Sequence, residues 1–260
     1  MAMDKKIFLS VVIPAYNEEK NIKAGALKEV FDYLKRQKYS WEVLLVDDGS
    51  KDSTVSLLTQ FCQKHKGLPA GRQAFKVLKE PHRGKAGTVI AGVLASVGDI
   101  VLFTDMDQAT PIHELEKILP KFEDGYDIAI GSRLGREGYP FIRKTMAYGF
   151  MILRTIILKL PYKDTQCGFK AFKKQVAKEI FKRMQVFKEN AKMSGASVKA
   201  GFDLEILYIA RKLNYKVAEV TVDWHEKNLR REVNPIKDSY EGLRDLLRVR
   251  KNAIMGKYKL

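Results

Sequence analysis

The amino-acid sequence predicts an α/β protein built on a mostly parallel sheet with helices on both faces. Short apolar runs, of which Ile100–Phe103 is the clearest, are bounded by glycine or polar residues, as expected for strands buried on both faces. These runs alternate with longer stretches of helical periodicity, which is the pattern of parallel strands joined by crossover helices. With 260 residues and 45% hydrophobic content, the chain can fill the core of one large domain.

Each strand is expected where an apolar run ends in a turn or a helix-start signal. Pro14 is expected to stop the first ladder, and Asn17 can then cap a helix that begins with two acids and runs through Leu34. The expected strands are residues 9–13, 41–46, 75–78, 100–103, 127–131 and 217–222. Further helices are expected to start at 52–53 and within 82–87, and to span 112–122, 141–160, 174–183 and 238–254. Another is expected to follow 201–205 as far as 212, after a polar insertion at 188–199.

Composition limits the classes of partner. The formal net charge of +16 and the pI of about 9.6 favour anionic partners, such as phosphorylated small molecules, acidic lipid or nucleic acid. Nucleic-acid binding is disfavoured because the sequence contains neither a recognised binding module nor an aromatic and basic face. Two cysteines give no disulfide framework, so we expect a reducing, cytoplasmic compartment.

Membrane crossing is not expected from the sequence. The first apolar run, residues 7–13, is short and is followed by Pro14 and acids, which fits a buried strand rather than a signal sequence. The longest apolar candidate, residues 146–160, contains Arg154 and Lys159 and falls short of the roughly 18 apolar residues needed to span a bilayer. We therefore expect a protein that is soluble or peripheral to a membrane.

Two carboxylates at the end of the fourth strand are the strongest candidates for chemistry. Asp105 and Asp107 are two residues apart, so they project to the same side if the extended conformation persists through Met106. Carboxylate oxygens are the ligands that hard divalent cations prefer, and the carboxyl ends of strands are where open α/β sheets bind ligands. A D-x-D triplet alone is weak evidence, because carboxylates in loops usually cap helices or face water.

Six motifs in a fixed order resemble a known family. They are VVIPAYNEE, VDDGSKDST, RGKAGT, TDMDQATP, GSR and DTQCGFK. Together they resemble the family 2 glycosyltransferases with the Rossmann-like GT-A fold, and most closely the polyprenyl-phosphate hexosyltransferases, over residues 9–250. The resemblance implies an inverting transfer of glucose from UDP-glucose to a polyprenyl phosphate at the cytoplasmic face of a membrane. Mannose transfer from GDP-mannose is the alternative. The resemblance further implies a nucleotide-sugar-binding half, 1–135, and an acceptor-binding half, 136–260.

The resemblance also assigns the donor site. A divalent ion, Mg²⁺ or Mn²⁺, would be held by Asp105, Asp107 and Gln108. The implied nucleotide-binding residues are Pro14, Ala15, Tyr16, Glu18, Asp47, Asp48, Arg83, Lys85, Asp105 and Met106. Two of these assignments have ordinary alternatives. Asp47 and Asp48 can form turns and caps, and Arg83 with Lys85 can be a solvated helix start.

The acceptor side is predicted from charge. A phosphate monoester has its second pKa near 6, so its oxygen is already a competent nucleophile at neutral pH and needs a cationic clamp more than a base. Arg133 and Arg143 fit the clamp because arginine holds phosphate bidentately, although Arg143 can also be the wet face of its helix. The candidate acids at the acceptor end are Asp164, Asp203 and Glu205, and buried acids also commonly cap helices or pair with lysines.

A membrane contact and a donor lid complete the expectations. The stretch from Phe150 to Leu160, with Arg154 and Lys159 among its charges, suits a helix lying among lipid headgroups, and residues 248–251 add attraction to acidic lipid. Packing in the core is the alternative for its apolar residues. The resemblance places Glu232 where the family has a lysine that contacts phosphate. Arg231, next to it, is expected to take over that contact. Assembly as a homo-oligomer is left open by the sequence.

Overall fold

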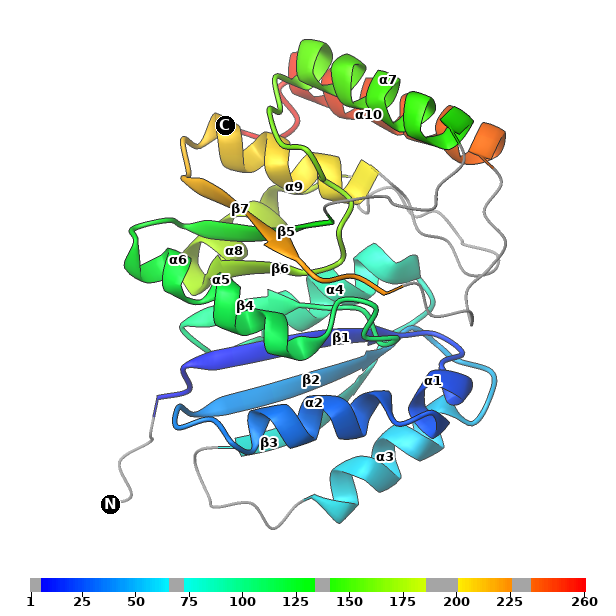
Figure 1. Ribbon diagram of the computed structural model, residues 1–260, viewed down its shortest axis with the longest axis vertical. Coiled ribbons are helices and arrows are strands. Elements are labelled where there is room, and N and C mark those ends of the chain that lie inside the picture. Colours follow the sequence, from blue (N-terminus) through cyan, green and yellow to red (C-terminus); the bar gives the residue numbers. More distant parts are fainter. Residues whose placement is uncertain (1–5, 66–72, 134–140, 186–200, 226–234) are drawn as a thin grey trace.

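The computed structural model describes residues 6–65, 73–133, 141–185, 201–225 and 235–260, without the side chains of 73, 141–147 and 235–239. Its centre is a seven-stranded sheet in the order β3-β2-β1-β4-β6-β5-β7 (Figure 1). The strands are β1 Leu9–Ala15, β2 Trp41–Asp47, β3 Gln73–Lys79, β4 Ile100–Phe103, β5 Ile128–Arg133, β6 Lys170–Lys173 and β7 Val217–Val222. All neighbouring strands are parallel except β6, which runs antiparallel to β4 and β5. The predicted mostly parallel α/β sheet is confirmed.

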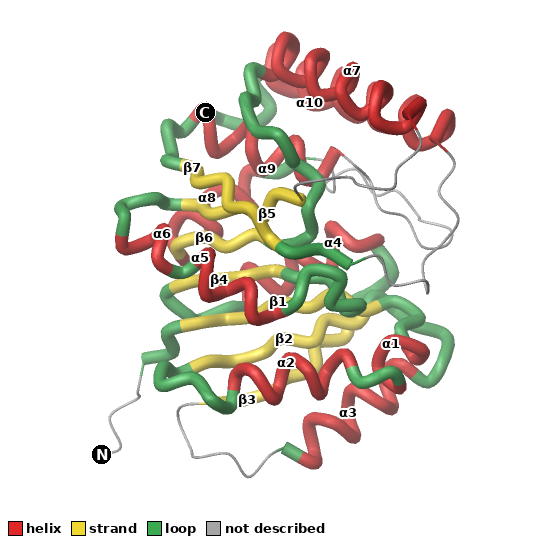
Figure 2. Tube along the Cα trace, viewed as in Figure 1, coloured by secondary structure: helices red, strands yellow, loops and turns green. Residues whose placement is uncertain are grey.

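Helices cover both faces of the sheet (Figure 2). They are α1 Glu19–Lys23, α2 Ala26–Leu34, α3 Thr54–Lys64, α4 Gly84–Ala95, the 3-10 turn η1 Ile112–Glu114, α5 Leu115–Ile118, α6 Pro120–Glu123, α7 Phe141–Leu158, α8 Lys174–Arg183, α9 Gly201–Lys212 and α10 Pro235–Ile254. Alternate residues of β1 pack into two separate cores. Val12 lies in the core shared with α4, α8, α9 and α10, whereas Val11 and Ile13 lie in the core shared with α2, α3 and α5.

Pro14 does not stop the first strand, as its sequence position led us to expect. Strand β1 continues to Ala15, and its last residues remain paired with β2. Pairing with β4 ends at Val12, so beyond that residue β1 has a ladder neighbour on one side only. A proline that lacks an N–H is tolerated at such a one-sided position, because no donor is required there.

Two expected helices are interrupted. The helix predicted to run through Leu34 is divided at Gly25, whose φ of +96° lies in the left-handed region that glycine adopts readily. The stretch predicted as one helix over 112–122 is instead η1, α5 and α6, and the last of these starts at Pro120. Proline has no N–H to continue the ladder of the preceding turn, so a new helix begins with it.

The outer layer of the molecule is formed by α7 and α10, which lie side by side (Figure 1). Contrary to the sequence expectation, Phe150 and Ile157 pack against the core, and Arg154 is buried, with 3% of its surface exposed. Among the side chains of α7 that the structure describes, the exposed apolar ones are Tyr148, Ile152, Leu153 and Ile156. Core packing, which the sequence left open as the alternative, therefore describes Phe150 and Ile157, and a membrane contact of α7 stays a prediction. Within the described part of the chain, no helix is long and apolar enough to cross a membrane.

Candidate functional site

The candidate site lies where β4, β5 and β7 end and where the loop before β6 leads into that strand. These ends meet at one edge of the sheet because the three strands point the same way and β6 starts at that edge. A pocket there encloses about 280 Å³ up to its open mouth. Its lining residues are Thr104, Asp105, Ala109, Thr110, Arg133, Gln166, Gly168 and Trp224. Asp105, which the sequence predicts for the donor side, and Arg133, which it predicts for the acceptor side, thus share one pocket.

Asp105 faces this pocket and is held from two sides. Its carboxylate forms an ion pair with Lys85, which reaches across from the first turn of α4. On the other side, the backbone of Gly168 approaches so closely that an added Cβ would lie 2.7 Å from Asp105 Cγ. Only glycine leaves room for the Asp105 carboxylate in this arrangement. Lys85 is therefore not merely a solvated helix start, since its charge is directed at the site.

Strand β4 ends at Phe103, so the chain is not extended through Met106. The condition under which Asp105 and Asp107 were expected to project to the same side is therefore not met. The chain turns at Asp105, whose carbonyl accepts a hydrogen bond from Gln108 N at 3.2 Å. Asp107 is 6% exposed, and its Oδ1 accepts a hydrogen bond from Ala109 N at 3.0 Å. The side chain of Met106 is buried in the core, so contact with a nucleotide is left to its backbone.

The donor atoms around this turn fit a hard divalent cation. Asp105 and Asp107 supply carboxylate oxygens, and Gln108 supplies an amide oxygen on the same turn. Gln108 Nε2 donates to the Asp105 carbonyl at 2.8 Å, while the buried Oε1 accepts no hydrogen bond from the described residues. A buried acceptor in that condition is satisfied by a cation or a water molecule. The residue types therefore suit Mg²⁺ or Mn²⁺.

Arg133 and Asp164 form a bidentate ion pair at the pocket wall. Arg133 Nε and Nη2 donate to the two carboxylate oxygens at 2.6 and 3.0 Å, and Arg133 N donates to Oδ2 at 3.2 Å. Burial by itself raises the pKa of Asp164, but the hydrogen bonds and charge of Arg133 outweigh it and lower that pKa to about 2. Asp164 therefore remains charged at neutral pH, and it fixes the plane of the Arg133 guanidinium.

The loop that carries Asp164 is secured by neighbouring elements. Asp164 N donates to Glu219 Oε1 of β7 at 2.8 Å, which ties the loop to the sheet. From the other side, the buried Arg154 of α7 donates to Thr165 Oγ1 at 2.9 Å and to the Tyr162 carbonyl. Arg154 thus connects the outer helix layer to the loop that positions Arg133.

The two acids after β2 make turn and cap bonds. Asp47 Oδ2 accepts hydrogen bonds from Gly49 N and Ser50 N at 3.0 and 3.2 Å. Asp48 accepts from Arg83 N at 2.7 Å and Gly84 N at 2.8 Å, so its carboxylate caps the start of α4. The alternative that the sequence left open, turn and cap formation, describes these bonds. A contact with a nucleotide base stays a prediction.

His82 joins the predicted base pocket, although sequence reasoning gave it no role. Its Nδ1 lies 2.9 Å from Asp48 Oδ2, and its ring stacks on Tyr16 with centroids 4.3 Å apart and planes at 17°. The stack forms a flat aromatic surface beside the carboxyl ends of β1 and β2. Glu18 lies near it and accepts from Asn21 Nδ2, while Pro14 and Ala15 are buried in β1.

The remaining acids of the acceptor prediction have partners inside the protein. Asp203 Oδ1 accepts from the fully buried Lys170 at 2.5 Å, and Lys170 also donates to the Cys167 carbonyl. Glu205 is fully buried on α9 and accepts from Gln185 N at 2.9 Å. These bonds secure α9 against β6 and the end of α8, and an acceptor role for either acid stays a prediction. Arg143, Arg231 and Glu232 lie outside the described side chains.

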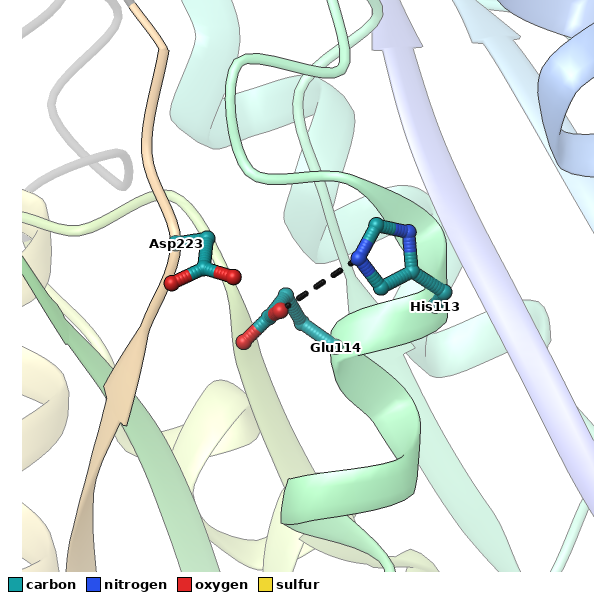
Figure 3. A group of neighbouring side chains, drawn as sticks. All are labelled: His113, Glu114 and Asp223. Atoms are coloured by element: carbon teal, nitrogen blue, oxygen red, sulfur yellow. Dashed lines mark ion pairs between the residues drawn. The ribbon is translucent and has the colours of Figure 1, made fainter.

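A second group of polar residues ties the end of β7 to the turn after β4. His113 and Glu114 on η1 point toward Asp223 on the facing strand end (Figure 3), with their ligand atoms within 4.8 Å of one another. A metal could in principle sit there. However, the Lys117 ammonium already lies 2.9 Å from Glu114 Oε2 and 3.6 Å from Asp223 Oδ2. We therefore interpret the group as an ion network.

Sequence reasoning missed Gly168 and Trp224 as pocket residues, although Gly168 stands inside the DTQCGFK motif. For Trp224 a signal was available. It lies two residues beyond the buried Val222, so an extended chain places both side chains on the same face of the sheet. For Gly168 there was none, because its close approach to Asp105 depends on the pairing of β6 with β4.

Known proteins show the same sequence pattern and fold. The family model described as glycosyl transferase family 2 matches residues 10–181. The chain is 34% identical over 270 residues to a dolichyl-phosphate beta-glucosyltransferase of Dictyostelium discoideum, covering 98% of this chain and 77% of the relative. It is likewise 34% identical to the Homo sapiens dolichyl-phosphate beta-glucosyltransferase, with 97% and 78% covered.

Solved structures agree at the level of the fold. Glucosyl-3-phosphoglycerate synthase from Mycobacterium tuberculosis, solved with Mn²⁺ and UDP-glucose, superposes with a TM-score of 0.57 at 15% identity over 94% of this chain and 80% of that one. Mannosyl-3-phosphoglycerate synthase from Rubrobacter xylanophilus gives a TM-score of 0.59 at 17% identity, with 96% and 75% covered. The fold is that of the GT-A glycosyltransferases.

Proposed function

Because the chain belongs to glycosyl transferase family 2, we propose that it transfers glucose from UDP-glucose to a polyprenyl phosphate of the dolichyl type. The acceptor and the sugar are those in the names of its relatives at about a third identity over nearly the whole chain. The observation that carries the proposal is the convergence of Asp105, Lys85 and the Arg133–Asp164 pair on one pocket at the carboxyl edge of the sheet.

The donor diphosphate is assigned to the Asp105 side of the pocket. Asp105, Asp107 and Gln108 would hold a divalent ion, which when bound neutralises charge developing on the leaving diphosphate. Lys85 brings a cation to the same place from the N-terminal turn of α4, where backbone N–H groups also favour anions. The Tyr16–His82 surface offers the nucleoside base a flat aromatic partner. All of these donor residues come from the 1–135 half.

The acceptor phosphate is assigned to Arg133. In the proposed step, a phosphate oxygen of the lipid attacks the anomeric carbon, a new C–O bond forms, and the bond from that carbon to the diphosphate breaks. UDP leaves with the electron pair, and the anomeric centre inverts. A protein base is not needed, since the phosphate monoester is largely deprotonated near neutral pH. Asp164 holds the Arg133 guanidinium in one plane, which reduces the entropy lost when it binds phosphate.

The lipid part of the acceptor is assigned to the outer helix layer. Tyr148, Ile152 and Ile156 of α7 are 62%, 41% and 69% exposed, and Leu247 of the neighbouring α10 is 52% exposed. Arg244, Arg250 and Lys251 are exposed on α10 near these apolar residues. Apolar side chains beside cations suit the headgroup region of an acidic membrane. We place this surface at the cytoplasmic face, where nucleotide sugars would meet the lipid.

A transfer assay tests the proposal. Purified protein is incubated with a short polyprenyl phosphate and labelled UDP-glucose or GDP-mannose, each with Mg²⁺, Mn²⁺ or a chelator, and the lipid product is counted. We expect glucose transfer that requires the metal and falls below one hundredth in D105N, with the fold of the variant checked by its melting temperature. If product forms only from GDP-mannose, GDP-mannose replaces UDP-glucose as the proposed donor. Full activity of D105N would exclude the proposed role of Asp105 in metal binding.

A further inference from the structure

Trp224 lines the pocket from the end of β7, the edge strand opposite β3. It follows β7 directly, it is half-buried, and its ring lies 5.7 Å from the Arg133 guanidinium carbon. Asp105 and Gly168 line the same pocket. The indole therefore shares one small space with the residue assigned to the metal and the residue assigned to the acceptor phosphate.

The segment that carries Trp224 is fixed to the turn after β4. His225 N donates a hydrogen bond to the Ala109 carbonyl at 2.8 Å, immediately beyond the indole. Just before it, Asp223 lies 3.6 Å from the Lys117 ammonium, which also pairs with Glu114. Figure 3 shows Asp223 opposite Glu114. Contacts on both sides of Trp224 thus limit the movement of its backbone relative to the D-x-D turn, and a held aromatic ring loses little entropy when it binds a ligand.

The indole is the one aromatic side chain among the described residues that line this pocket. The other lining side chains are polar, charged or small. A hexose ring has the matching character, since hydroxyl groups surround its rim while its C–H bonds form an apolar face. An aromatic ring with a negative face packs well against such C–H groups. The remaining polar residues can accept and donate hydrogen bonds at the rim.

The order of the strands identifies the sugar concerned. In the Tyr16–His82 stack, Tyr16 follows β1 and His82 follows β3; Asp105 follows β4, and Trp224 follows β7 at the opposite end of the sheet. In a nucleotide sugar, base, diphosphate and hexose follow one another in the same order. With the base at the stack and the diphosphate at Asp105, the hexose that follows the diphosphate is directed toward the ends of β5 and β7, where Trp224 lines the same pocket as Asp105. We propose that Trp224 is the platform on which the hexose ring of the donor packs, an inference that rests on the proposed function.

Binding of UDP and of UDP-glucose separates a sugar contact from a general defect. Dissociation constants are measured by calorimetry with Mg²⁺ for wild type, W224A and the matched variant W224F, which keeps an aromatic face. We expect W224A to bind UDP-glucose about tenfold more weakly while its affinity for UDP stays within about twofold, and W224F to lie close to wild type. Melting temperatures confirm that each variant is folded.

Intrinsic fluorescence gives a second readout. The chain has two tryptophans, and Trp41 is fully buried in β2, so a response to bound sugar reports on Trp224. We expect UDP-glucose to change the emission of wild type more than UDP does, and W224F to lose that difference. Equal losses of UDP and UDP-glucose affinity in W224A, or no loss of either, would overturn the platform.

The wild-type protein alone tests the proposed function in the same experiment. If it binds neither UDP-glucose nor GDP-mannose, the donor assignment fails, and the platform fails with it. If it binds GDP-mannose, the same comparison is made with GDP and GDP-mannose, and the W224A result again decides.

Discussion

Replacing Asp164 by Asn tests how the structure holds Arg133. The substitution keeps the shape of the side chain but removes the charge that two guanidinium nitrogens and one backbone N–H contact. The Asp164 side chain is 5% exposed, so water cannot replace these contacts. We therefore expect D164N to be less stable than wild type and to hold Arg133 less firmly.

The magnitude follows from the pKa of Asp164. A fall from the ordinary value of 3.8 to about 2 corresponds to about 2 kcal/mol of stability, or a melting temperature about 4–8 °C higher in a chain of this size. Because the pKa is lowered in the folded state, this contribution is complete above pH 4. It decreases as the pH falls through 3.8 towards 2, and about half of it should be gone near pH 3.

Urea unfolding of wild type and D164N at pH 7 and pH 3 measures both quantities. The matched control is D124N, which breaks an exposed pair with Lys121 and should leave the midpoint close to wild type. The reasoning is refuted if D164N unfolds at the same urea concentration as wild type at pH 7. It is equally refuted if the difference at pH 3 is as large as at pH 7.

Two further predictions address the metal site and the membrane surface. G168A should push the Asp105 carboxylate aside and lower metal-dependent UDP affinity at least tenfold in calorimetry, while metal-free binding changes little; unchanged affinity would contradict the close approach. On α7, I156D should reduce flotation with acidic vesicles severalfold because its side chain is 69% exposed, whereas F150D should unfold the protein at a lower temperature because Phe150 packs against the core. Equal flotation of I156D and wild type would remove this surface from membrane binding.

The features that the sequence predicts well are those with a local signal. Six of the seven described strands and most helices follow from apolar runs and cap residues, and Asp105, Lys85 and Arg133 stand at the ends of such elements. The helix break at Gly25 had a local signal as well, since glycine favours the positive φ found there. Whether a glycine interrupts a helix that the surrounding periodicity favours depends on tertiary packing, which periodicity does not report.

The features that were missed depend on contacts between distant parts of the chain. The spacing of Phe150, Leu153 and Ile157 predicts a stripe, but which side of α7 that stripe faces is decided by α10 and by the buried Arg154. An arginine inside an apolar stretch suggests a solvent-exposed helix face when its hydrogen-bond partners are unknown. Here the Tyr162 carbonyl and the Thr165 hydroxyl replace water, so burial becomes favourable.

Of the features that the sequence did not predict, strand β6 has the largest effect on the site. A strand parallel to β4 and β5 would begin at the opposite edge of the sheet, and the loop before it would lie far from the carboxyl ends of its neighbours. Because β6 is antiparallel, its first residue pairs with the last residue of β4, and the loop before it lies at the ligand-binding edge. That loop brings Gly168 against Asp105 and Asp164 against Arg133. The single reversed strand therefore joins the donor and acceptor sides into one pocket.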